Sequence, residues 1–372
     1  MATAGFAARI DRARHHMSAQ GVDALLLSVG ADLPYLTGYE AMPLERLTML
    51  VLPAEGDAHL VVPGLEAPRV VERPGVFTVV PWGETDDPIA IVADLAGSVG
   101  TAAIGDTTWA GFLVDLQRAM PDTAFGRASA VMSELRAVKD DAEIQSLRRA
   151  AEAVDRIAAR LQTGEIPLIG HTEAEVSAEL GRQIIAEGHH RVNFAIVAAG
   201  PNAASPHHEP GATVIEPNQV VLCDFGGTMP GTDGIGYCSD ITRCVYTGEP
   251  PTEFRELYDV LYEAQAASVA AATVGTPCER VDAVGRAVIA DGGYGEYFIH
   301  RTGHGIGVEG HEDPYIVEGN ATPLVAGHAF SVEPGIYVPG RWGARLEDIV
   351  VAAEAGPDPL NRVDHHLAVV DA

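Results

Sequence analysis

Four carboxylates and one imidazole in the second half of the chain constrain its fold more than any other feature. Each lies in or beside a short apolar segment that ends in glycine or a turn, and such segments are typical of β-strands. We expect β-sheets to project these side chains into one pocket. The five residues are Asp224, Asp240, His304, Glu333 and Glu347.

A pocket of this composition predicts a metal site. Several clustered carboxylates cannot all remain ionised unless cations lie among them. Four carboxylates and one histidine form an oxygen-rich set of hard ligands, which suits two divalent metal ions such as Mn²⁺, with Co²⁺ and Zn²⁺ as alternatives. Two such ions in one site indicate metal-assisted hydrolysis.

Composition argues against several other classes of protein. The formal net charge is −28, whereas binding to nucleic acid or to an anionic membrane needs a basic surface. No segment approaches the roughly 18 apolar residues of a membrane-spanning helix, and the first residues lack the apolar run of a signal peptide. The four cysteines form no Cys-x-x-Cys pair, so we expect them to be reduced and the protein to be cytoplasmic.

The patterns divide the 372 residues into two predicted domains. Residues 1–138 alternate helical and strand patterns, which predicts an α/β domain with a mixed sheet. An amphipathic helix is expected over residues 7–20, with Gly21 as its C-terminal glycine. A β-hairpin is expected between residues 46–52 and 58–62.

Residues 139–372 are expected to form an α+β domain. A long amphipathic helix is predicted over residues 142–161, and the capping box Thr172-Glu-Ala-Glu175 begins a second helix. Strands then follow one another at hairpin distance, which favours antiparallel pairing over a parallel βαβ array. Two further helices are expected over residues 253–272 and 279–290.

Three motifs carry a resemblance to a known family. They are Ser239-Asp-Ile-Thr-Arg243, His300-Arg-Thr-Gly-His-Gly-Ile-Gly307 and Glu333-Pro-Gly-Ile-Tyr337. Together they resemble the pita-bread metallopeptidases, which include aminopeptidase P, Xaa-Pro dipeptidase (prolidase), methionine aminopeptidase and creatinase. The segments Gly21-Val-Asp-Ala-Leu-Leu-Leu27 and Tyr35-Leu-Thr-Gly38 are similar to the N-terminal domain of the aminopeptidase P and prolidase branch.

The resemblance implies both a fold and an activity. The second domain would be a pita-bread (creatinase/aminopeptidase-like) catalytic domain, and the first an α/β creatinase-type domain. The activity would be hydrolysis of short peptides, above all Xaa-Pro dipeptides, by a water molecule that two metal ions activate. The alternative is an aminopeptidase P that removes the first residue from longer Xaa-Pro peptides. Relatives are commonly dimers, so we expect a homodimer.

A non-catalytic binding protein of the same fold is a third hypothesis. Binding-only relatives have lost metal ligands, whereas this chain retains a residue of the right type at every ligand position of the family pattern. Creatinase also lacks the metal carboxylates. The retained set therefore favours an enzyme.

The resemblance also implies a role for each of the five residues. Asp224 would chelate one metal ion, while Asp240 and Glu347 would each bridge both ions. His304 would be the single histidine ligand. Glu333 would bind one ion and also handle the proton of the nucleophilic water.

Four further residues match positions around the family's metal site. His207 and His311 would be catalytic and would bind substrate by holding the scissile carbonyl and the developing oxyanion. His300 would shape the pocket for proline. Arg345 would pair with carboxylates of the ligands or of the substrate. His208 is an alternative to His207, although His207 fits the family register better.

One departure from the family pattern concerns the two aspartates. The stretch between Asp224 and Asp240 is longer than is usual in the family and is rich in glycine and proline. These residue types favour turns, so we expect an inserted surface hairpin that leaves both aspartates in place.

Overall fold

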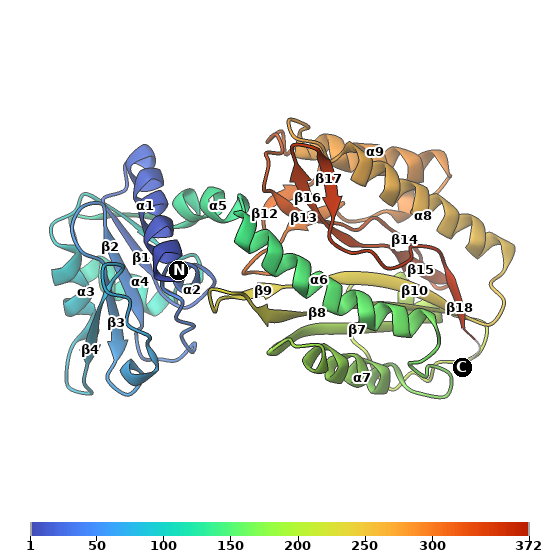
Figure 1. Cartoon of the computed structure of the whole chain (residues 1–372), viewed down its shortest axis with the longest axis horizontal. Coiled ribbons are helices and arrows are strands. Elements are labelled where there is room, and N and C mark those ends of the chain that lie inside the picture. The colour runs from blue at the N-terminus through green and yellow to red at the C-terminus, as the bar shows by residue number, and fades with distance from the viewer. Residues whose placement is uncertain (1, 371–372) are drawn as a thin grey trace. The chain divides into compact units, whose positions relative to one another are not determined.

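The computed structural model describes residues 2–370 and divides into two compact units. The first contains the chain up to Arg136 together with Thr232–Ile235, and the second contains the remainder from Ala137 onward. Figure 1 shows that each unit combines helices with β-sheet. Within the described residues, no helix is both long enough and apolar enough to span a bilayer.

A mixed six-stranded sheet forms the centre of the first unit. Its strands, in spatial order, are β4 (Thr78–Trp82), β3 (His59–Pro63), β2 (Met49–Pro53), β1 (Ala24–Leu27), β5 (Thr101–Ile104) and β6 (Ala124–Arg127). The helices are α1 (Ala2–Gln20), α2 (Asp32–Thr37), α3 (Pro88–Ala96), α4 (Ala110–Ala119) and α5 (Ser129–Ala137), and one 3-10 helix is η1 (Ala67–Arg69). The predicted hairpin is the antiparallel pair β2 and β3, while β1 and β5 are parallel.

In the first unit, the sequence predicts where a long helix ends, but it does not reveal the short helices. Helix α1 ends where the sequence predicts, because Gly21 has a φ of 66°, a left-handed conformation that favours glycine. The same helix begins at Ala2, earlier than its apolar periodicity predicts. Alanine has a high intrinsic helix propensity, which does not depend on that periodicity. Helices α2 and α5 were not predicted from the sequence, since short helices give little periodicity.

Two five-stranded sheets form the second unit. The first has the order β18 (Ala368–Val370), β10 (Ile241–Thr247), β8 (Val220–Pro230) and β7 (Arg191–Ala199), and β9 (Gly236–Cys238) pairs with β8. The second has the order β12 (Glu312–Ile316), β11 (Gly303–Gly305), β13 (Ala329–Val332), β16 (Asp348–Ala353) and β17 (Gly356–Pro359). A separate hairpin joins β14 (Gly335–Val338) and β15 (Trp342–Arg345). Most neighbouring strands are antiparallel, as the α+β prediction requires.

Four helices cover these sheets. They are α6 (Asp141–Gln162), α7 (Glu173–Ala186), α8 (Thr252–Ala271) and α9 (Cys278–Asp291), with short 3-10 helices η2 (Gly200–Ala204) and η3 (Gly295–Tyr297). Helices α6 and α7 share an apolar core with one face of the first sheet, and α8 shares a core with its other face. Helix α9 contributes to a core with the second sheet. The predicted capping box at Thr172 and Glu175 is present at the start of α7.

The alternation of side chains along β8 decides where Asp224 points. Cys223 and Phe225 lie in the core with α6 and α7, whereas Val220 and Leu222 lie in the core with α8. Successive side chains of a strand point to opposite faces, so Asp224 lies on the face of Val220 and Leu222.

The stretch between the two aspartates forms the predicted hairpin. Strand β8 continues beyond Asp224 to Pro230 and pairs with β9, and the chain then returns through β10. In that return Thr242 lies directly opposite Asp224, so Asp240 is held nearby whatever the length of the hairpin. Gly226 allows this close approach, because a methyl group at that position would overlap the Ser239 carbonyl.

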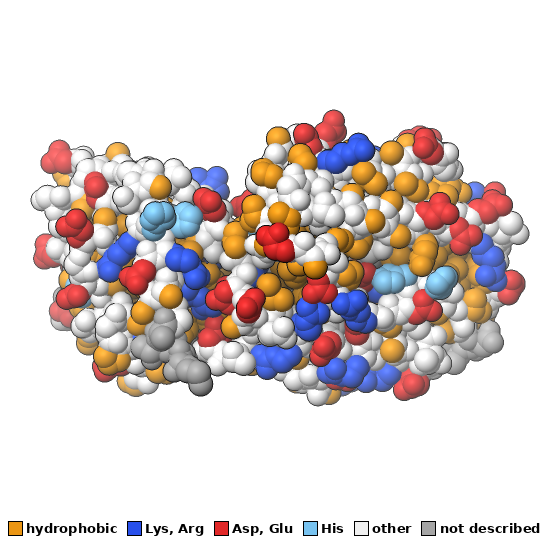
Figure 2. Space-filling model, turned by 45° about the horizontal axis from the view of Figure 1, so that its top comes forward, with side chains coloured by type: hydrophobic (Ala, Val, Ile, Leu, Met, Phe, Trp, Pro, Cys, Tyr) orange, Lys and Arg blue, Asp and Glu red, His pale blue; other side chains and the backbone are white. Residues whose placement is uncertain are grey.

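Charged side chains are spread over the surface. Figure 2 shows acidic groups scattered across the face that it presents, with arginines between them. On this face the acidic side chains are therefore scattered rather than gathered in one patch.

Replacement of Gly226 by alanine is expected to lower the free energy of unfolding by about 1–3 kcal/mol, because the added methyl group forces the strands apart. Denaturant titration measures the change. Gly181→Ala is the control: its methyl group would lie 3.8 Å from Val192, and alanine in a helix is favoured by up to about 1 kcal/mol. Wild-type stability in the Gly226→Ala variant would contradict the close-approach argument.

Candidate metal and catalytic site

The structure brings the five predicted ligand residues into one cavity of about 330 Å³ in the second unit. Asp224 lies within β8 and Asp240 directly precedes β10, so both belong to the first sheet. His304 lies within β11, while Glu333 directly follows β13 and Glu347 directly precedes β16. The predicted ligands that line the cavity therefore lie within or directly beside strands of two different sheets.

His304 is held so that its ring points a nitrogen lone pair at the carboxylates. Its Nδ1 lies 3.1 Å from the Gly305 carbonyl oxygen, which can only accept, so Nδ1 carries the hydrogen. In the neutral ring, Nε2 is then an acceptor, and it lies 3.1 Å from Glu333 Oε1 and 3.9 Å from Asp240 Oδ2. A lone pair that faces two carboxylates is favourable only when a proton or a cation lies between them.

The acidic groups show the same need for a cation. Asp224 Oδ1 and Asp240 Oδ1 are buried and have no hydrogen-bond partner. Burial raises the pKa of Asp240 and Glu347 well above the ordinary range, and neighbouring carboxylates raise both further. Burial also raises the pKa of Asp224, against the opposing charge of Arg345.

Glu333 differs from its acidic neighbours. Burial disfavours its charged form too, but a protonated His304 would donate to it, and that hydrogen bond and charge, with the positive charges nearby, outweigh burial and lower the pKa of Glu333. When His304 is neutral and binds a cation, the charge of the cation takes the place of that proton. Ser331 Oγ donates to Glu333 Oε1 at 2.9 Å and accepts from the His304 backbone N–H at 3.0 Å. Ser331 thus links the predicted ligands His304 and Glu333.

These residues fit divalent cations. One ligand atom each from Asp240, His304 and Glu347 lie within 4.8 Å of one another, and Asp224 and Glu333 line the same cavity. Carboxylate oxygens and one neutral imidazole form a hard donor set. The two orphaned oxygens and the inward lone pair of His304 are the acceptors that such ions would satisfy.

A buried threonine and a buried arginine orient the carboxylates. Thr242 Oγ1 donates to Glu347 Oε2 at 2.6 Å and accepts from Arg345 Nε at 3.1 Å. Arg345 Nη2 forms a short ion pair with Asp224 Oδ2, so this guanidinium pairs with a predicted ligand. Arg345 Nη1 donates to Tyr337 Oη at 2.8 Å.

His300 lies on the same network. Its Nδ1 is 2.7 Å from the Arg301 carbonyl oxygen and therefore carries the hydrogen, so Nε2 accepts from the Tyr337 hydroxyl at 2.9 Å. Burial lowers the pKa of His300, which favours the neutral ring. Tyr337 was missed as a site residue, although it ends the Glu-Pro-Gly-Ile-Tyr motif.

The adjacent residues His207 and His208, in the loop between η2 and β8, have different surroundings. His207 is exposed and lines the cavity, whereas His208 Nε2 lies 2.8 Å from Glu173 Oε2. Glu173 is fully buried and also accepts from the backbone N–H groups of Ala199 at 2.8 Å and Gly211 at 3.3 Å. Glu173 therefore fixes both ends of the loop that presents His207.

His311 packs directly on a predicted metal ligand. Its ring lies 3.8 Å from the ring of His304, centroid to centroid. Loss of hydration and the neighbouring His304 lower the pKa of His311 to about 4. Arg301 Nη2 lies 3.3 Å from His311 Nδ1, and the Arg301 guanidinium stacks 4.4 Å from the centre of the Tyr315 ring.

All nine predicted site residues line this cavity, together with four that sequence reasoning missed. The four are Phe194, Ile196, Pro206 and Arg301. Phe194 and Ile196 alternate on β7, and Ile196 lies opposite Asp224 in the sheet. Apolar strand residues carry no sequence signal that distinguishes a cavity wall from a core. Arg301 did carry a signal, because it is the second residue of the motif His300–Gly307.

The cavity has the composition of a divalent-metal centre in a hydrolytic enzyme, and comparisons with known proteins agree. Residues 145–354 match Metallopeptidase family M24, and residues 9–138 match the Creatinase/Prolidase N-terminal domain. The probable dipeptidase PepE of Mycobacterium tuberculosis is 42% identical over 369 residues, which cover 98% of this chain and 96% of that protein. The Xaa-Pro dipeptidase of Lactobacillus delbrueckii subsp. lactis is 34% identical over 373 residues, with coverage of 97% and 98%.

A solved structure gives the same result for the fold. The crystal structure of dipeptidase PepE from Mycobacterium ulcerans has a TM-score of 0.92 and 42% identity, covering 99% of this chain and 98% of that chain. The chain therefore belongs to Metallopeptidase family M24. It is a peptidase with a pita-bread catalytic domain and a creatinase-type N-terminal domain, which confirms the predicted fold and family.

Replacement of Thr242 by valine is expected to weaken Mn²⁺ binding by about 10- to 100-fold, because Glu347 and Arg345 both lose a hydrogen-bond partner. Calorimetric titration of the metal-free protein measures the affinity. Thr247→Val is the matched control, since this threonine is equally buried on the same strand but bonds only backbone groups of Glu216 and Gln219. Equal affinities in the two variants would contradict the orienting role of Thr242.

Proposed function

We propose that this peptidase hydrolyses Xaa-Pro dipeptides with two divalent cations, preferentially Mn²⁺, held by the five predicted ligands. The observation that carries the proposal is the single cavity in which four carboxylates and His304 meet three further histidines. The names of the Mycobacterium and Lactobacillus relatives support a dipeptidase. We further propose a cytoplasmic homodimer that binds neither nucleic acid nor membranes, in keeping with the net charge of −28.

Glu333 is the proposed proton carrier of the reaction. Bound cations would polarise the peptide carbonyl and lower the pKa of a water molecule, so that hydroxide is available near neutral pH. Glu333 lines the cavity beside His304, with Oε1 3.1 Å from Nε2, and as an ionised carboxylate it would take the proton of the attacking water. The same group then delivers that proton to the leaving nitrogen.

His311 and His207 are proposed to hold the scissile carbonyl. Arg301 donates to His311 Nδ1, so the hydrogen of the neutral ring is on Nε2 and is available for an oxyanion. The lowered pKa of His311 keeps the ring neutral at physiological pH. His207 lines the same cavity from the loop that Glu173 fixes.

The shape of the cavity favours a small substrate with a ring. Its volume of about 330 Å³ is at the low end for ligand pockets, which run from about 300 to 1,000 Å³. Phe194, Ile196 and the neutral ring of His300 offer apolar surface to proline. The imino nitrogen of proline has no N–H, so the site needs no acceptor for it.

A panel of peptides tests the proposed substrate class. Mn²⁺-loaded protein is expected to hydrolyse Ala-Pro and to leave Ala-Pro-Ala nearly intact, because a cavity of about 330 Å³ suits a dipeptide better than a longer peptide. Product amines measure the rates. Glu333→Ala is the catalytic control and is expected to lower kcat by at least about 10²-fold without unfolding the protein. Preferential cleavage of Ala-Pro-Ala would support the aminopeptidase P alternative instead.

Arg301 is the proposed partner of the dipeptide's terminal carboxylate, since it lines the cavity and carries a positive charge beside His311. Arg301→Met is expected to lower kcat/KM for Ala-Pro by about 10- to 100-fold, the range of a charged hydrogen bond. The amide of the same dipeptide should respond far less to the substitution, because it carries no negative charge. An equal loss for acid and amide would show that Arg301 acts only through His311.

A further inference from the structure

The two halves of the metal site belong to different sheets. Asp224 and Asp240 are carried by the sheet of β8 and β10, whereas His304, Glu333 and Glu347 are carried by the sheet of β11, β13 and β16. The spacing of the five ligands therefore depends on how the two sheets are registered. At β10 and β16 the backbone link is an isolated bridge in which the Glu347 N–H donates to the Thr242 carbonyl at a long 3.3 Å.

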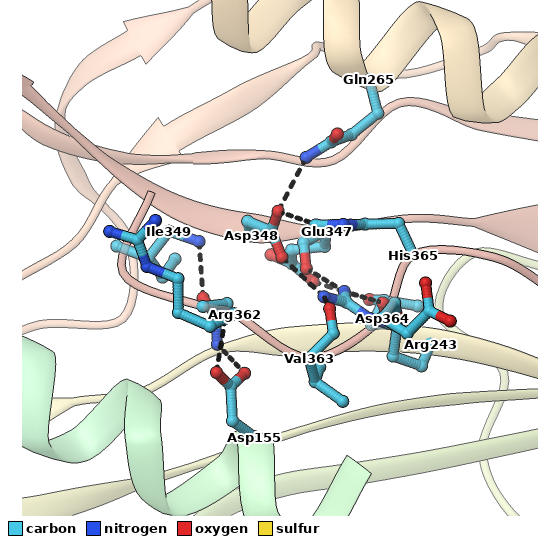
Figure 3. A network of polar contacts seen from close by, with 12 residues as sticks. Asp155, Arg243, Gln265, Glu347, Asp348, Ile349, Arg362, Val363, Asp364 and His365 are labelled. Carbon is cyan, nitrogen blue, oxygen red and sulfur yellow. Dashed lines mark hydrogen bonds and ion pairs between the residues drawn. The ribbon is translucent and has the colours of Figure 1, made fainter. Parts of the chain in front are cut away.

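A buried arginine reinforces this junction. Arg243 is fully buried, and Figure 3 shows its guanidinium beside Glu347, Asp348 and the segment 363–365. Nη1 donates to the carbonyl oxygens of Thr242 at 3.0 Å and Glu347 at 2.7 Å, so one nitrogen holds both sides of the junction.

The other nitrogens of Arg243 complete the junction. Nη2 donates to Asp348 Oδ1 at 2.8 Å and to the Val363 carbonyl at 3.2 Å, and Nε donates to the Asp364 carbonyl at 3.0 Å. All five N–H groups of the guanidinium therefore have acceptors. Lysine has three donors on one nitrogen and cannot span this set of acceptors.

The charge of Arg243 is balanced by a carboxylate that is itself held from two sides. Asp348 Oδ2 accepts from Gln265 Nε2 of α8 at 3.0 Å and pairs with His365 Nε2. A buried ion pair is rigid when every polar atom is satisfied, and removal of one member leaves an uncompensated charge.

The C-terminal segment is fastened to the same junction. Asn361 Oδ1 accepts from the Ile349 N–H at 2.8 Å, while Asn361 Nδ2 donates to Asp155 Oδ1 of α6 at 3.0 Å. Figure 3 shows Asp155, on its helix, reaching this segment. Asn361 thus ties α6 to β16, and further along the chain the carbonyls of Val363 and Asp364 accept from Arg243.

We propose that Arg243 is a positioning residue of the metal site, which acts by fixing the distance between the two sheets that carry the ligands. Arg243, Asp348 and the segment 361–365 do not line the cavity; they act through the backbone of Thr242 and Glu347. The inference depends on the proposed metal centre and adds the C-terminal segment to the parts that the centre requires.

Mn²⁺ titration of metal-free Arg243→Lys tests the inference. We expect affinity to fall by about 10- to 100-fold, the range for residues that orient metal ligands. We also expect the paramagnetic resonance spectrum of the di-manganese form to change, because coupling between two ions depends on their separation. Arg148→Lys is the control, since it alters a half-buried ion pair with Asp358 in the same unit.

A milder variant covers the outcome in which Arg243→Lys does not fold. Gln265→Leu removes one hydrogen bond to Asp348 and contacts no ligand, and it is expected to weaken Mn²⁺ binding in the same direction but by less. Wild-type affinity and spectrum in folded Arg243→Lys, or unchanged affinity in Gln265→Leu when Arg243→Lys is unfolded, would overturn the inference. Absence of Mn²⁺ binding by the wild-type protein would instead contradict the proposed function.

Discussion

The crowding of carboxylates in one buried cavity is the physical constraint on which the rest of the second unit depends. Asp224, Asp240 and Glu347 are almost fully buried, and their pKa values are raised because burial and mutual repulsion disfavour charge. Such a cluster is stable only with compensating charge. The protein supplies part of it through Arg345 and leaves oxygens free for cations.

The fold meets this constraint by placing the predicted ligands within strands or directly beside them, and by holding four of the five with a second group. Thr242 orients Glu347, Ser331 orients Glu333, and the Gly305 carbonyl sets the tautomer of His304. Because the predicted ligands come from two sheets, their spacing depends on the junction at Thr242 and Glu347 as well as on the ligands themselves. At this junction the buried Arg243 and Asp348 lie outside the cavity and bond to each other.

Much of this site was predictable from residue type and local pattern. The apolar strands that end in an acid predicted convergence, and the structure places all nine predicted residues on one cavity. The catalytic and ligand roles remain predictions. The choice of His207 over His208 agrees with the contact of His208 to Glu173. Phe194 was missed because an apolar residue of a cavity wall looks like any core strand residue, whereas Arg301 was missed although it lies within the motif His300–Gly307.

The sequence by itself determined the chemistry of the groups, the helix ends at Gly21 and Thr172, and the alternation that turns Asp224 away from Cys223. Only the tertiary structure decided which groups meet. Arg345 reaches Asp224, and Arg243 reaches Asp348, across more than a hundred residues of chain. The physical reason is that strand periodicity fixes the face on which a side chain lies but not the strand that packs against it.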